Sequence, residues 1–150
     1  MSELTQEQAQ RILQQQLVKY IDYAGQYDIL PKIARLSKEA GIVYPERTNV
    51  VYRAVPGLDD YPYTEEEIIE QEVESEIVST SYEKTSAMEF IEETAADWGY
   101  LLTYHVTSDS IVADFDYLVE EYGWDEIDRD EKEILIDVEK SNLINIEKVR

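Results

Sequence analysis

The chain has 150 residues, a length typical of one domain with its own hydrophobic core. Its 43% hydrophobic and 11% aromatic content predicts a folded globule and argues against a disordered chain. Because the chain has no cysteine, disulfide bonds, thiolate metal sites and cysteine nucleophiles are excluded. A formal net charge of −21 disfavours direct binding to nucleic acid or to anionic membranes, since such a field repels phosphate.

The acidity leaves three interpretations open. It can keep the protein soluble, it can attract a basic partner protein, or it can imitate the charge of DNA and block a DNA-binding partner. The sequence shows neither a basic segment followed by an apolar stretch at its start nor an apolar run long enough for a membrane helix. We therefore expect a cytoplasmic protein, in the cell's own cytoplasm or in that of an infected host.

The first third of the chain is predicted to be helical. Apolar residues recur at helical spacing over residues 13–24, which indicates an amphipathic helix. A second helix is predicted to begin at Pro31 and to end just before Gly41, because these residue types suit the first turn and the C-terminal cap. Residues 1–47 are thus interpreted as a helical N-terminal region of a single domain, 1–150, whose strand-rich core is 48–150.

Short runs of β-branched and aromatic residues between turn residues predict the strands of this core. They lie at 49–55, 76–81, 100–106, 133–138 and 143–149. The helices predicted between them are one behind a capping box at Thr64, one over 84–98, and one capped by Ser110 and ended by Gly123. Helices come first and strands follow without regular alternation, so the predicted class is α+β.

Arg53 lies inside an otherwise apolar strand, Val50–Val55. A buried guanidinium without a partner is costly, so we expect it to meet an anion. One candidate is a phosphate group, which matches the planar fork of N–H donors. The other is one of the many acidic side chains of this chain, in a salt bridge.

Hydroxyl groups gather at the end of the next predicted strand, in Ser79-Thr80-Ser81. They can orient a ligand and a catalytic carboxylate by hydrogen bonding. They can equally form a turn and cap the helix that follows. Further along that helix, Phe90 is either a core residue or an aromatic surface for a ligand ring.

Two carboxylates, Glu131 and Glu133, open the strand near residue 133. Side-chain direction in a strand repeats every two residues, so both are predicted on one face. Such a pair can stabilise developing positive charge and accept a proton. The alternative is a solvated strand face in an acidic chain.

Other catalytic patterns are incomplete in this sequence. His105 has no cysteine partner, and no serine lies in a Gly-x-Ser-x-Gly turn. The acid-rich stretch 125–133 lacks the glycine and the ligand spacing of a calcium loop. No glycine-rich dinucleotide loop or phosphate loop is found. We therefore expect no metal cofactor.

Taken in order, Arg53, Ser79-Thr80-Ser81 and Glu131-Lys132-Glu133 resemble the Arg–Ser–Glu signature of the mono-ADP-ribosyltransferase family, in its arginine-modifying branch. These enzymes cleave NAD and move ADP-ribose onto a protein side chain. The resemblance covers about residues 50–149, and the small size is similar to that of bacteriophage transferases or toxin catalytic domains.

The resemblance implies a split β core with N-terminal helices and a cleft for NAD, which is a substrate. It implies that Glu133 is catalytic, that Glu131 helps activate the acceptor and that Ser79 braces the site. The residues implied in NAD binding are Arg53, Ala54, Ser79, Thr80, Ser81 and Phe90. The implied partner is a target protein, expected to be basic or nucleic-acid-binding because of the acidic charge.

The sequence departs from the family pattern at two places. Ala54 follows the arginine where a glycine is common, and Asp128 stands where an aromatic residue often lies in the acceptor-recognition turn, Tyr122–Asp130, although Trp124 is close by. A second hypothesis is therefore kept. The chain can be a non-catalytic acidic binding protein, similar to a DNA mimic or to an inactive transferase, that blocks a basic partner.

Overall fold

The structure is a computed structural model that describes residues 4–22, 29–45, 50–57, 64–93, 98–128 and 132–149. Its helices are α1 (Gln6–Asp22), α2 (Leu30–Glu39), α3 (Glu65–Ser75), α4 (Lys84–Glu93) and α5 (Phe115–Tyr122). Its strands are β1 (Val50–Pro56), β2 (Ile77–Ser81), β3 (Gly99–His105), β4 (Ile111–Asp114), β5 (Glu133–Asp137) and β6 (Asn142–Val149). The described residues also include the 3₁₀ turns η2 (Ser108–Ser110), η3 (Asp125–Ile127) and η4 (Val138–Lys140). The predicted α+β class is confirmed.

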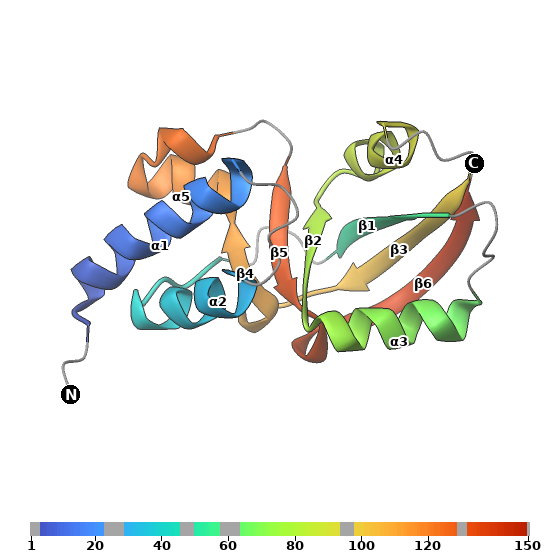
Figure 1. The fold of residues 1–150 in the computed structure, drawn as a ribbon, viewed down its shortest axis with the longest axis horizontal. Helices are drawn as coiled ribbons and strands as arrows, with labels where there is room; N and C mark the ends of the chain where they lie inside the picture. Colours follow the sequence, from blue (N-terminus) through green and yellow to red (C-terminus); the bar gives the residue numbers. More distant parts are fainter. Residues whose placement is uncertain are drawn as a thin grey trace.

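The strands form one antiparallel sheet in the order β4-β5-β2-β1-β3-β6. The connection between β1 and β2 is a single registered pair, Tyr52 with Ser81. By contrast, β1 pairs with β3 along its whole length, from Val50 to Pro56. The sheet therefore consists of two three-stranded parts that diverge between β2 and β1, as Figure 1 shows.

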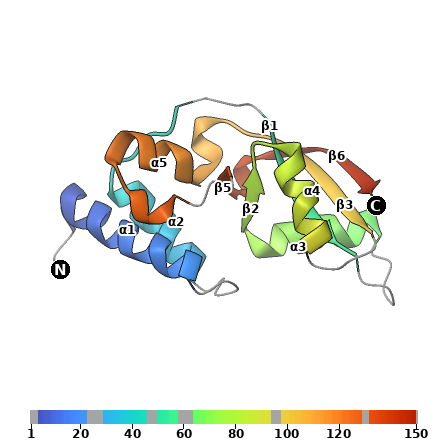
Figure 2. The ribbon, with the colours of Figure 1, turned by 90° about the horizontal axis from the view of Figure 1, so that it is seen from above.

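Helices cover the two parts differently (Figures 1 and 2). Helices α1, α2 and α5 gather beside β4 and β5 and share one apolar core with them. On the other part, Ile68 of α3 packs against Val51, whereas Ile91 of α4 packs against Ala54. Because side chains at an odd separation in a strand point to opposite faces, α3 and α4 cover opposite faces of β1.

Several predicted helix ends are confirmed. Thr64 and Glu67 form the expected capping box at the start of α3, and α2 has a proline in its first turn. Gly41 (φ 67°) and Gly123 (φ 68°) have the left-handed conformation typical of helix C-terminal caps. The predicted ends of the first helix, at Ala24 and Gly25, lie outside the described residues, as do positions 94–97 of the predicted 84–98 helix.

The helix predicted behind Ser110 is present as α5 and ends at Gly123 as expected, but its predicted start at Ser110 is wrong. Residues 111–114 form β4, which pairs with β5, and α5 begins only at Phe115. The cap of α5 is Asp114, whose carboxylate accepts from the Tyr117 backbone N–H at 3.2 Å. Ser110 is buried and donates instead to the Lys140 carbonyl at 2.7 Å. Strand pairing of an apolar, β-branched run thus outweighs the capping preference of serine.

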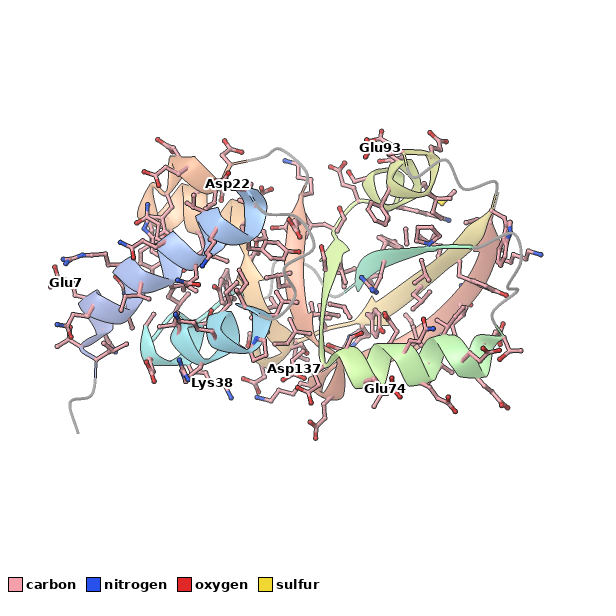
Figure 3. The ribbon with its side chains drawn as sticks, viewed as in Figure 1. Glu7, Asp22, Lys38, Glu74, Glu93 and Asp137 are labelled. Atoms are coloured by element: carbon pink, nitrogen blue, oxygen red, sulfur yellow. The ribbon has the colours of Figure 1, made fainter. Side chains whose placement is uncertain are left out.

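Acidic side chains lie around the outside of the molecule. Figure 3 shows Glu7, Glu74 and Glu93, from three different helices, at its periphery. Within the described ranges, no helix has both the length and the apolar character needed to cross a membrane. The negative charge is therefore displayed on several surfaces and is not confined to one element.

Candidate active site

The hydroxyl of Ser79 is bonded to the carboxylate of Glu133. Strands β2 and β5 pair with Ser81 opposite Glu133, so Ser79 is a diagonal neighbour of Glu133 on the same face. Ser79 Oγ donates to Glu133 Oε2 at 2.6 Å, a length typical of a charge-assisted hydrogen bond. Two residues that are 54 positions apart in the chain are therefore in direct contact.

Arg53 is the second predicted residue at this place. Its Nε lies 2.7 Å from Oε1 of Glu72 and donates to Oε2 at 2.9 Å. Its Nη1 donates to the Ser79 carbonyl at 3.1 Å. Of the two partners that the sequence left open, the structure thus shows the acidic side chain. Arg53 and Glu133 both contact Ser79, Arg53 at its carbonyl and Glu133 at its hydroxyl.

Glu72 was not singled out in the sequence, where it is one of many acids in α3. It is 3% exposed, and besides Arg53 it accepts from the Tyr104 hydroxyl at 2.8 Å. Burial, followed by the negative charge of Glu72, raises the pKa of Tyr104 above its ordinary value. The sequence signal was the spacing: Glu72 lies four residues after Ile68, on the face of α3 that turns toward the sheet.

The guanidinium and the carboxylate approach from opposite faces of the sheet. The side chain of Arg53 points to the same face of β1 as that of Val51, which packs in the core beneath α3. The side chain of Ser79 points to the same face of β2 as that of Ile77, which belongs to the core of α1, α2 and α5. The two groups are therefore connected through the backbone of Ser79, at the place where β1 and β2 diverge.

The other two hydroxyls of the serine-rich patch form hydrogen bonds with backbone groups, one on the neighbouring strand and one in the following turn. Thr80 Oγ1 donates to the Ile134 carbonyl at 2.9 Å, across the β2–β5 pairing. Ser81 Oγ accepts from the Glu83 backbone N–H at 3.2 Å, in the turn before α4. Of the two predicted uses, the turn before α4 is found at Ser81, whereas Ser79 contacts the carboxylate of Glu133.

Two further residues that the resemblance implied in NAD binding lie on and beneath α4. Ala54 is 8% exposed and packs with Ala87 and Ile91 in the core under this helix. Phe90 is 49% exposed, so the core position considered for it is not the observed one. In the predicted acceptor turn, Trp124 is buried and its ring lies 5.3 Å from that of Tyr122.

The expectation of one strand face for Glu131 and Glu133 is not supported by the backbone. Strand β5 begins at Glu133, and Lys132 has a φ of 56°, which is far from an extended conformation. The two-residue alternation therefore stops at Glu133 and cannot be used to place Glu131, which lies outside the described residues. Lys132 Nζ is 3.4 Å from Asp116 Oδ2 of α5.

Glu133 has a partner that the sequence did not suggest. The Tyr20 hydroxyl of α1 donates to Glu133 Oε2 at 3.0 Å.

In the described ranges, no group of three or more histidine and acidic side chains is arranged to hold a metal ion. Comparison of the chain with protein-family models, with curated proteins and with solved structures gave no match.

Proposed function

We propose that the protein is an NAD-dependent mono-ADP-ribosyltransferase that transfers ADP-ribose from NAD to an arginine of a target protein. The observation that carries the proposal is the 2.6 Å hydrogen bond from Ser79 to Glu133, on a serine that Arg53 also contacts. Three residues chosen for their order in the sequence thus form one connected group. An ADP-ribosyltransferase-like split sheet, as part of the proposal, is supported by the divergence of β1 from β2.

The proposed reaction breaks the bond between C1′ of the ribose and the nicotinamide nitrogen, and the electron pair leaves with nicotinamide. Positive charge develops on the ribose, where a fixed carboxylate stabilises it. We assign this role to Glu133. A nitrogen of the acceptor guanidinium then bonds to C1′ and gives one proton to the carboxylate of Glu131, to which we also assign the alignment of the acceptor.

Arg53 is suited to hold a phosphate of NAD through hydrogen bonds more than through net charge. Glu72 offsets the charge of its guanidinium, but the two contacts also fix its orientation. Its Nη2 has no hydrogen bond to any described residue, and the side chain is 25% exposed. A fixed planar group with remaining N–H donors fits a phosphate oxygen.

The acidic surface supports a proposal for the target. A net charge of −21 would steer the protein toward basic surfaces, such as those of nucleic-acid-binding proteins. The same charge, together with the Arg53–Glu72 pair, supports a second candidate function. In that case Arg53 has only a structural role, and the protein is a non-catalytic acidic binder that covers the nucleic-acid surface of a basic partner.

Incubation with labelled NAD and a cell lysate tests the first proposal. We expect label on a protein band with the wild type and none with Glu133→Gln. The matched control is Glu147→Gln, which removes the same charge from an exposed position on β6 and should label as the wild type does. Equal labelling by the wild type and Glu133→Gln would remove Glu133 from the mechanism.

Calorimetry separates the two candidate functions. A transferase should give heat with NAD at millimolar concentration. A non-catalytic binder should give none, and should instead capture a basic protein in a complex that weakens as salt is added. Absence of NAD binding together with salt-sensitive capture would replace the first proposal by the second.

A further inference from the structure

Tyr20 connects the N-terminal helical region to the proposed catalytic carboxylate. It lies near the end of α1 and is 9% exposed. Its ring stacks on that of Phe115, with centroids 6.3 Å apart and planes 13° from parallel. The hydroxyl donates to Glu133 Oε2 at 3.0 Å, across 113 positions of sequence. The ring is thus held in the core while its polar end reaches the site.

Two donors from different elements meet at the same oxygen. Tyr20 of α1 and Ser79 of β2 both donate to Oε2 of Glu133. The terminal torsion of a glutamate side chain is broad, so a single hydrogen bond leaves the plane of the carboxylate poorly fixed. Donors that approach from a helix and from a strand restrict both its position and its rotation.

We propose that Tyr20 is a positioning residue for Glu133, and this inference rests on the proposed transferase function. Through its hydroxyl, Tyr20 holds the carboxylate in the orientation that stabilises positive charge on the ribose during loss of nicotinamide. A preorganised charge of this kind acts on the transition state more than on the binding of NAD. Helix α1 therefore contributes to the active site as well as to the core.

The test measures nicotinamide release from NAD by the full chain, comparing Tyr20→Phe with the wild type. The substitution keeps the ring and removes only the hydroxyl. We expect kcat to fall about tenfold while KM for NAD changes less than about twofold. The matched control is Tyr44→Phe, which removes a hydroxyl from another tyrosine of the same core cluster and should keep wild-type kinetics.

A double-mutant cycle with Ser79→Ala gives a second measurement. Because both donors act on one carboxylate, the loss of kcat in the double variant should differ from the product of the two single losses. Thermal melting of each variant supplies the folded fraction, so that kcat is expressed per folded molecule. A cycle that is strictly multiplicative would show two independent effects and would overturn the shared role.

The outcomes for Tyr20 and for the proposed function are distinguishable. If the wild type releases no nicotinamide, the transferase proposal fails and the role of Tyr20 fails with it. If the wild type is active and Tyr20→Phe matches Tyr44→Phe, only the role of Tyr20 is overturned. A Tyr20→Phe chain that does not fold overturns it as well, because the hydroxyl is then required by the fold.

Discussion

Arg53 and Glu72 form an ion pair whose acidic partner is almost wholly buried. The distance from Nε to Oε1 is 2.7 Å, and the Glu72 side chain is 4% exposed against 25% for Arg53. A carboxylate buried to this degree is tolerated only when charged or polar donors surround it, and Tyr104 supplies the second one. The pair joins α3 to β1, and through the Ser79 carbonyl it also joins both to β2.

Glu72→Gln should destabilise the protein. The substitution leaves the guanidinium of Arg53 without its counter-charge beside the sheet, and we expect a loss of about 2 to 3 kcal/mol in the free energy of unfolding, measured by urea denaturation. Glu74→Gln, on the solvent side of the same helix (Figure 3), should change it by less than about 0.5 kcal/mol. Similar losses in the two variants would show that the buried pair contributes no more than surface charge.

Arg53→Lys should weaken binding of NAD. Lysine keeps the charge but loses the planar fork that reaches Glu72 and Ser79 together. If Arg53 holds NAD, we expect the dissociation constant for NAD, measured by calorimetry, to rise about tenfold. A parallel urea denaturation of Arg53→Lys separates this effect from lost stability. A folded Arg53→Lys protein with unchanged affinity would leave Arg53 with the structural role only.

Stability should fall at alkaline pH because of buried tyrosines. Burial raises the pKa of Tyr104 and of Tyr44 above the ordinary value of 10.0. The unfolded chain therefore releases these protons at a lower pH than the folded chain does. The contribution of the two protonated tyrosines to the free energy of unfolding is fully present below about pH 10. It is lost as the pH rises further, by about 1 kcal/mol for each tyrosine at about pH 11.

Urea denaturation at several pH values checks the alkaline loss. Tyr104→Phe should be less stable at neutral pH, because Glu72 loses a donor. Above about pH 10 its stability should nevertheless fall less steeply than that of the wild type. A wild-type free energy of unfolding that does not change between about pH 9 and about pH 11 would contradict the prediction.

The sequence predicted well those elements whose signals are local. The capping box of Thr64 and the left-handed glycines at 41 and 123 depend on neighbouring residues and are found as expected. Strand β4 was missed because a strand of four residues is too short to show the two-residue alternation of apolar and polar side chains. Its identity depends on pairing with β5, and no local pattern reports a partner twenty or more positions away.

The site was predictable in part, for a similar reason. Arg53, Ser79 and Glu133 could be selected because each is a polar residue in an apolar or β-rich setting. Their partners could not. Glu72 shares a helix face with Ile68, but this spacing is a weak signal in a helix with many acids, and Tyr20 fits the apolar face of α1, so neither could be named as a partner before the chain is folded. Contacts across 19 and 113 positions are set by packing.

The two carboxylates near residue 133 should differ in their roles. Glu133→Gln should lose both nicotinamide release and arginine modification by about a hundredfold or more, because charge on the ribose then lacks its partner. Glu131→Gln should reduce arginine modification by a similar factor yet keep measurable nicotinamide release, since departure of nicotinamide does not need an aligned acceptor. Both reactions are measured with NAD and a small guanidine as acceptor.

The control for this pair is Glu139→Gln, which removes one charge at an exposed position just after β5 and should leave both reactions unchanged. All three substitutions lower a large negative charge by one, so a general electrostatic effect would change the two reactions alike in all three variants. Only the assigned catalytic roles predict that the effects of Glu131→Gln and Glu133→Gln differ from each other and from that of Glu139→Gln. If Glu131→Gln and Glu133→Gln keep full transfer in a folded protein, the carboxylates are structural, and Glu133 is only the acceptor for the hydroxyls of Ser79 and Tyr20.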